Sequence, residues 1–211
     1  AYSRHPGSLY RVFVRLGFRK KVESTKKKSK HLGKYDTPET IGEKWQMDVK
    51  YVPKACDSRD EKEQYYQYTV IEEASRKRFI YAYQEQSSYS TVDFFKRAIT
   101  YFGYAPNILQ TDNGSEFTHT QKTKRIHPLD VFCSTYGIVH KMIRPRTPWH
   151  NGKVERSHRN DQERFYNHLN FYSFEDLQEQ MKRYLYRSNN IPMAVLGWKS
   201  PNQKQHELGG Q

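Results

Sequence analysis

Three acidic residues of this 211-residue chain lie at positions where a carboxylate is locally unfavourable, which makes them candidates for chemistry. Asp48 lies in the middle of an alternating run that predicts a β-strand, an element in which Asp is depleted. Asp112 opens an Asp-Asn-Gly turn, and Glu155 falls in the first turn of a predicted helix. Mg²⁺ prefers hard oxygen ligands, so these carboxylates are candidates for binding a divalent cation. Taken singly, a common turn explains Asp112 as well, and the helix dipole explains Glu155 better. Three further acids compete for the same role: Glu72, Glu73 and Glu116.

The spacing of apolar residues predicts the elements that would position these acids. Trp45, Met47 and Val49 face one side of the first strand, and Asp48 faces the other. We predict strands over 45–52, 64–72, 78–84, 107–111 and 138–143. We predict helices within 8–18 and over 90–102, 128–136, 153–169 and from 174 onward. Three strands, followed by helices that alternate with two more strands, indicate a mixed α/β domain.

Capping residues predict where several of these helices begin and end. Ser90 with Asp93 fits a capping box at the start of the second helix, and Gly103 ends that helix. Ser173 with Asp176 fits a cap before the last helix.

Basic charge is concentrated in two parts of the chain. The formal net charge is +13, and residues 1–34 hold eleven Lys and Arg against Glu23 alone, a local +10. Residues 119–159 hold nine Lys and Arg against two acids, a local +7. Clustered cations attract polyanions by releasing their counterions, so a nucleic-acid partner is favoured over a merely solvated tail.

Several classes of protein are excluded by composition. The sequence has no apolar run near the ~20 residues of a membrane span and no apolar segment typical of a signal peptide. Its two cysteines, Cys56 and Cys133, form neither a disulfide framework nor a CxxC zinc motif. A reducing, intracellular setting is therefore expected. The chain opens without Met, as a fragment of a longer protein would.

Three motifs, in order, carry a resemblance to a known family. They are WQMDVKYV (45–52), LQTDNGSEF (109–117) and NGKVERSHR (151–159), and YRSNNIPMAVLGWKSPNQK (186–204) adds to them. Together they resemble the catalytic core of DDE transposases and retroviral-type integrases, in the RNase H-like polynucleotidyl transferase superfamily. The resemblance spans about 44–204 and implies an RNase H-like mixed five-stranded sheet flanked by helices, with a basic N-terminal arm.

The resemblance implies that Asp48, Asp112 and Glu155 form the acidic triad and bind two Mg²⁺ or Mn²⁺ ions. Two such ions supply an activated nucleophile and a stabilised leaving oxygen for phosphodiester cleavage. The family separates its second Asp from its Glu by about 35 residues, whereas 42 residues lie between them here. We expect the surplus to be an enlarged loop over 119–127.

Basic and polar residues near the triad are candidates for DNA contact. Helical spacing places Arg159 and Gln162 on one face with Glu155, and the resemblance implies that these two positions touch DNA near the cut; an ion pair of Arg159 with Glu155 is the less favoured alternative. The other candidates are Lys50, Asn113, Arg144, Arg146, His150, Lys153 and Arg156, with Lys20, Lys21, Lys26, Lys27 and Lys28 on the arm. Residues 1–18 resemble the end of a helix-turn-helix domain, with a simple basic tail as the alternative.

We therefore expect a remnant helix-turn-helix domain (1–18), a basic linker (19–44), a catalytic core (45–204) and a short tail (205–211). The expected activity is metal-dependent cleavage of transposon ends and strand transfer into target DNA. Double-stranded DNA is the expected partner, bound by at least a dimer, and a bacterial cytoplasm or nucleoid the expected location. Two alternatives stay open: a domesticated DNA-binding protein without activity, and an RNase H-like nuclease that does not join strands.

Overall fold

A computed structural model of the chain describes residues 6–18, 37–60, 62–119, 121, 123–143 and 151–209. The chain divides into two units, Ala1–Tyr35 and Asp36–Gln211. The first unit contains α1 (Pro6–Arg15), the helix predicted within 8–18, and Gly17 follows it with a φ of 74°. Apolar side chains of this segment are exposed, among them Leu9, Val12, Phe13 and Leu16.

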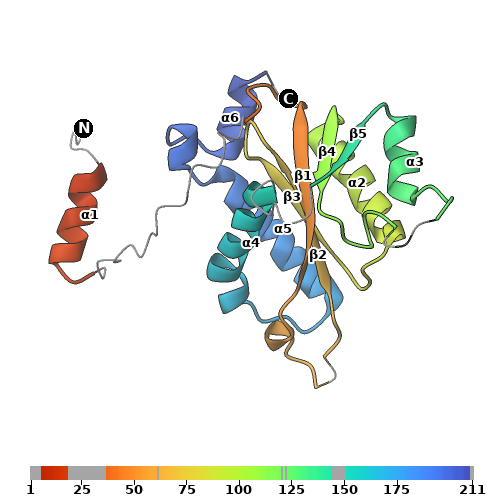
Figure 1. Ribbon diagram of the computed structural model, residues 1–211. Coiled ribbons are helices and arrows are strands. Elements are labelled where there is room, and N and C mark those ends of the chain that lie inside the picture. Colours follow the sequence, from red (N-terminus) through yellow and green to blue (C-terminus); the bar gives the residue numbers. More distant parts are fainter. Residues whose placement is uncertain are drawn as a thin grey trace. The chain divides into compact units, whose positions relative to one another are not determined.

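The second unit is built on one five-stranded sheet, as the sequence predicts (Figure 1). Its strands are β1 (Lys44–Tyr51), β2 (Tyr66–Glu72), β3 (Arg78–Tyr83), β4 (Ile108–Thr111) and β5 (Val139–Met142). The order across the sheet is β3-β2-β1-β4-β5. The first three strands are antiparallel, whereas β4 pairs in parallel with both β1 and β5.

Helices cover both faces of this sheet (Figure 1). On one face, Trp45 and Met47 of β1 pack in a core with α2 (Ser88–Phe102) and α3 (Pro128–Thr135). On the other, α4 (Gly152–Arg164) and α5 (Phe174–Asn190) lie on the strands. Successive side chains of β1 therefore point to opposite faces of the sheet. The apolar ones enter the core with α2 and α3, and the polar ones, Asp48 among them, face α4.

Two helix boundaries differ from the sequence prediction, and both have a local cause. The N-cap of α2 is Ser87, not Ser90, because the Ser87 hydroxyl accepts the N–H of Ser90 and the helix begins one turn earlier. Helix α4 ends at Arg164 instead of continuing to 169, because Phe165 leaves the helical conformation. A 3₁₀ turn, η3 (Tyr166–His168), then places Tyr166 in the second core cluster.

The C-terminal part adds elements that the sequence analysis did not predict. Helix α6 (Pro201–Glu207) begins with a complete capping box, in which Ser200 and Gln203 exchange side-chain and backbone hydrogen bonds. It packs against α5 and runs past residue 204. Shorter 3₁₀ turns are η1 (Lys54–Cys56) and η4 (Ala194–Leu196). No helix within the described residues is long and apolar enough to cross a membrane.

Candidate active site

The parallel pairing of β1 with β4 brings two of the predicted acids to one place. Gln46 pairs with Gln110, and two residues further along each strand come Asp48 and Asp112. Paired residues of neighbouring strands point to the same face, so both carboxylates belong to the face that α4 covers. Asp112 directly follows the last residue of β4, at the carboxyl end of that strand.

Asp48 is the most perturbed acid of this site. Its side chain is 18% exposed. Burial is the largest influence on the Asp48 pKa, which is raised to about 8, and the charges of Asp112, Glu155 and Glu116 raise it further, while the N–H of Val49 lowers it. The Asp48 carboxyl therefore carries a proton at neutral pH unless a positive charge arrives to offset its acidic neighbours.

Asp112 is fixed by the turn that it opens. Its Oδ1 accepts the N–H of Gly114 at 2.9 Å, the Asx-turn geometry that the Asp-Asn-Gly sequence favours. The Asn113 side-chain amide donates to the carbonyl of Ile143 at 3.0 Å and so ties the turn to the end of β5. The turn-forming role and an active-site role are compatible here, because the turn orients one carboxylate oxygen and leaves the other without a hydrogen bond within the described residues.

Glu155 is exposed and lies in the first turn of α4. The start of that helix is anchored to the sheet, since Gln46 Oε1 accepts the N–H groups of Lys153 and Val154 at 3.1 and 3.2 Å. Over the residues that the structure describes, no three His, Cys, Asp or Glu side chains form a group able to hold a metal ion. The charge of Glu155 reaches Asp48, but the three acids do not form a closed metal site as they stand.

The sequence analysis missed a residue that lies directly beside the first acid. His158 Nδ1 is 3.4 Å from Asp48 Oδ2, on the turn of α4 that follows Glu155. Burial is the main cause that lowers the His158 pKa to about 4, so the imidazole is neutral at physiological pH. Helical spacing was the available signal: His158 is three residues after Glu155, so it neighbours Glu155 on the helix, on the side toward the sheet.

The structure places the described DNA-contact candidates in different environments. Lys50 Nζ donates to Gln162 Oε1 at 2.9 Å and lies 4.7 Å from the centre of the Tyr166 ring, so Lys50 and Gln162 hold each other. Lys153 pairs with the buried Glu73. Asn113 is exposed but donates its amide to the backbone. Two candidates are exposed on α4: Arg156 and Arg159.

The remaining candidates lie outside the described residues: Arg144, Arg146 and His150 before α4, and Lys20, Lys21, Lys26, Lys27 and Lys28 in the predicted linker. The predicted loop over 119–127 is described except at 120 and 122. Its ends meet, since the His119 and His127 rings are 5.1 Å apart in an edge-to-face arrangement.

The sheet order, its flanking helices and the acids on one covered face define an RNase H-like core of the integrase type. Residues 39–148 match a family model described as Integrase core domain, and residues 136–201 match a second model with that description. The first match covers more than half of the chain, so the chain belongs to the integrase core domain family.

Individual relatives agree with this family. A putative integrase of a Spiroplasma virus is 31% identical over 153 residues, which are 68% of this chain and 42% of that protein. A chain of the simian T-cell lymphotropic virus intasome in complex with PP2A regulatory subunit B56 gamma superposes with a TM-score of 0.65 at 18% identity, covering 82% of this chain and 58% of that one.

The HTLV-2 integrase catalytic core, solved in complex with magnesium, gives a TM-score of 0.58 at 20% identity over 79% of this chain and 98% of that one. At these identities, the two comparisons show that the fold is shared. The chain spans less than half the length of the curated relatives that it matches.

Proposed function

We propose that the chain is the catalytic core of a DDE-type polynucleotidyl transferase that cuts transposon ends and joins them to target DNA. The observation that carries this assignment is the parallel register that aligns Asp48 with Asp112 under the helix that bears Glu155. Membership of the integrase core domain family supports the same activity. The reaction replaces one phosphodiester bond by another or hydrolyses it, with water or a DNA 3′-hydroxyl as the nucleophile.

The donor set fits divalent cations, and we propose that two Mg²⁺ or Mn²⁺ ions bind at Asp48, Asp112 and Glu155. All three are carboxylates, the hard oxygen donors that Mg²⁺ prefers, and the HTLV-2 integrase core that this chain resembles in fold was solved with magnesium. When bound, the cations lower the pKa of a coordinated nucleophile and offset charge on the leaving oxygen. Because the three acids do not form a closed group, the exposed Glu155 side chain has to approach the two aspartates when a cation binds.

The neighbouring side chains hold these acids in place. Val49 N–H donates to Asp48 Oδ1 at 2.9 Å, and neutral His158 lies on the other carboxylate oxygen. Gly114 N–H fixes one oxygen of Asp112. Arg159, exposed one helical turn after Glu155, is placed to bind a DNA phosphate beside the cut.

DNA is the proposed partner, and at least two copies of the chain are proposed to act on it. Two DNA ends have to be joined in one event, and an intasome is among the structures that the fold resembles. The proposed location is the cytoplasm or nucleoid of a bacterial host, where such DNA would be met.

A strand-transfer assay tests the proposed activity and separates it from the alternatives. Labelled duplexes that carry transposon ends are incubated with supercoiled plasmid and Mg²⁺ or Mn²⁺. We expect cut ends joined to plasmid. Binding without cutting would support an inactive DNA-binding protein, and cutting without joining would support a nuclease of the RNase H-like kind.

Conservative substitutions test the acids themselves. Asp112→Asn and Glu155→Gln each remove one carboxylate while keeping its shape, so we expect both cutting and joining to fall by at least about 100-fold with DNA binding retained. Glu163→Gln is the matched control, because Glu163 is an exposed acid of α4 outside the site. Equal activity of Glu155→Gln and wild type would contradict the assignment of Glu155.

A further inference from the structure

Helix α4 presents two flanks on opposite sides. At 100° per residue, Glu155, Arg159 and Gln162 form one stripe, and Lys153, Arg156, Asn160 and Arg164 form the other, about half a turn away. Val154 and Asp161, between the stripes, are buried against the sheet. The first stripe belongs to the candidate active site, and the second faces a separate cavity.

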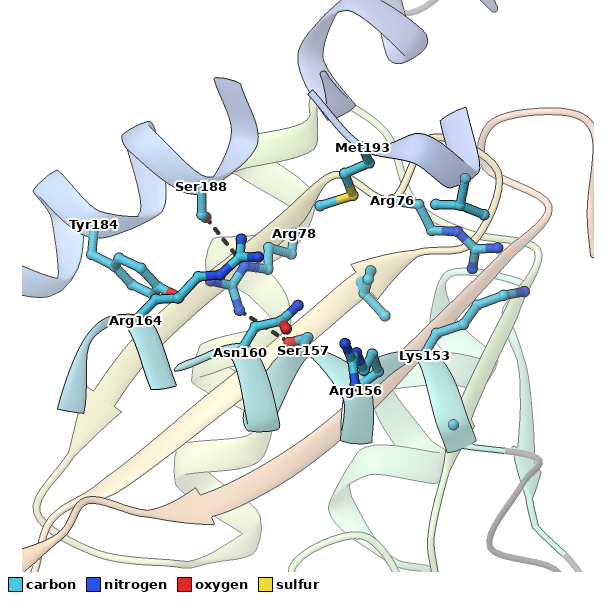
Figure 2. Close-up of a pocket in the computed structure, with 13 residues that line it drawn as sticks. Arg76, Arg78, Lys153, Arg156, Ser157, Asn160, Arg164, Tyr184, Ser188 and Met193 are labelled. Atoms are coloured by element: carbon cyan, nitrogen blue, oxygen red, sulfur yellow. Dashed lines mark hydrogen bonds between the residues drawn. The ribbon is translucent and has the colours of Figure 1, made fainter. Parts of the chain in front are cut away.

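This cavity, of about 400 Å³, lies between α4 and α5 beside the turn from β2 to β3 (Figure 2). Figure 2 shows Arg156, Asn160 and Arg164 along α4 facing Tyr184 and Ser188 of α5. Among the residues that the structure describes, five cationic side chains line it and no acidic one does: Arg76, Arg78, Lys153, Arg156 and Arg164. Apolar side chains complete the wall: Ile71, Met193 and Val195.

Two of these cations form ion pairs with buried carboxylates. Arg78 Nη1 pairs with the buried Asp161 at 2.6 Å, and Lys153 pairs with the buried Glu73. Arg78 is held further by the hydroxyls of Ser157 and Ser188 at 3.0 and 3.2 Å (Figure 2). The floor of the cavity is therefore a fixed guanidinium with little net charge.

Of the other three cations that line the cavity, Arg156 and Arg164 lie on its rim, and Arg76 lies in the turn between β2 and β3. Within the described parts of the chain, neither Arg156 nor Arg164 makes an ion pair, and both are exposed. Two guanidinium groups at a partly apolar cavity bind a phosphate better than they would in open water, because the low-polarity wall strengthens their attraction for an anion.

We propose that this cavity binds a backbone phosphate of DNA, in a stretch separate from the one at the acidic site, an assignment that rests on the proposed DNA-joining function. Helix α4 is about 10 Å across, so a backbone that passes the acids on one flank does not also enter the cavity on the other. The helix thus lies between two DNA backbone segments, with Arg156 and Arg164 as the contacts on the second flank.

The salt dependence of DNA binding tests this second contact. The full chain is titrated with a labelled 30-base-pair duplex at several salt concentrations, without divalent metal so that nothing is cut. Each phosphate contact contributes about 0.9 to the slope of log affinity against log salt. We expect the double variant Arg156→Gln/Arg164→Gln to give a slope shallower by about 0.9, for the one phosphate that it no longer contacts, and to bind on the order of tenfold or more weakly at 0.1 M salt.

Two matched variants separate a site from general charge. Lys182→Gln/Arg187→Gln removes two exposed cations of α5 outside the cavity, and we expect it to change the slope by less than half as much. Arg156→Lys/Arg164→Lys keeps the charge at both positions and should keep the slope. A retained slope shows that the change in the Gln variant comes from lost charge and not from a misfolded chain.

Equal slopes for the two Gln double variants would overturn the site, as would an unchanged slope for Arg156→Gln/Arg164→Gln. If that variant lost binding of a polyglutamate peptide while its DNA slope stayed at the wild-type value, the cavity would be an acidic-peptide site and the DNA assignment would be wrong. A wild-type chain that failed to join strands would contradict the proposed function and leave the slope comparison intact.

Discussion

At the scale of single residues, one buried carboxylate of α4 organises the surroundings of the site. Asp161 is fully buried and accepts hydrogen bonds from Arg78 at 2.6 Å, Tyr184 at 2.9 Å and Gln67 at 2.8 Å. Burial alone would raise the Asp161 pKa, but the charge of Arg78 and the hydrogen bonds from Gln67 and Arg78 lower it below its usual value. The helix that carries Glu155 is thus joined to β2, β3 and α5 through a single ionised group.

Removing that charge should destabilise the fold severely. Asp161→Asn leaves Arg78 buried without a counter-charge, a change that costs about 3–5 kcal/mol. For a chain of this size we expect the melting temperature to fall by roughly 6–20 °C in calorimetry. Glu179→Gln, which breaks the exposed pair with Arg183, is the control and should cost less than about 1 kcal/mol. Equal melting temperatures for the two variants would contradict this view of Asp161.

At the scale of elements, the cap of α3 fixes the end of the long loop before it to that helix. His127 is the N-cap of α3, and its Nδ1 accepts the N–H of Leu129 at 3.3 Å, which a protonated imidazole cannot do. Burial is the main cause that lowers the His127 pKa, and the neighbouring His119 lowers it further. The cap therefore depends on a neutral histidine.

This cap predicts a pH dependence with a definite sign. The folded pKa of His127 is below its unfolded value, so the unfolded state binds more protons, and the stabilisation is complete above about pH 6.5 and declines as the pH falls below that value. His127→Asn keeps a capping side chain that does not titrate. Unfolding free energies from urea titrations at pH 7.5 and 5.5 should show wild type losing more stability than His127→Asn. A larger loss in the variant would contradict the assignment.

Local patterns predicted the elements far better than they predicted contacts between them. The alternation of Trp45, Met47 and Val49 is a local signal, and the strand that it predicts is present. Whether Ser87 or Ser90 caps α2 depends on where the preceding chain enters the helix. The spacing of residues in the sequence does not determine that point.

The environment of the acids depended on tertiary structure. Lys50 was predicted to contact DNA, and that stays a prediction; its ammonium donates to Gln162 on α4, a residue 112 positions away, which no local pattern indicates. The cavity beside α4 could not be predicted from the sequence either, because its lining comes from β2, β3, α4, α5 and the segment after α5. No pattern within one segment of sequence describes such a site.

At the scale of the whole molecule, charge and core are divided between the two units. Residues 1–34 carry +10 of the net +13, which leaves +3 for the remainder. Both hydrophobic clusters lie in the second unit, Asp36–Gln211. Stability is therefore expected to reside in the second unit, whereas most of the net positive charge, which attracts polyanions, is in the first.

Truncation tests that division. A fragment of residues 36–211 should keep the thermal transition of the full chain within a few degrees, because it retains both core clusters. Its binding to duplex DNA should be weaker and less salt-dependent, with a slope reduced by at most about 10 for eleven lost cations. A fragment that bound DNA with the slope of the full chain would contradict a DNA-binding role for the basic segment.

Crystals soaked in Mn²⁺ test the central claim most directly, since the anomalous signal of the metal locates each ion. We predict Mn²⁺ bound by the carboxylate oxygens of Asp48 and Asp112, with the Glu155 side chain turned toward them from α4. Full-occupancy Mn²⁺ elsewhere, or none between these acids at millimolar concentration, would contradict the account.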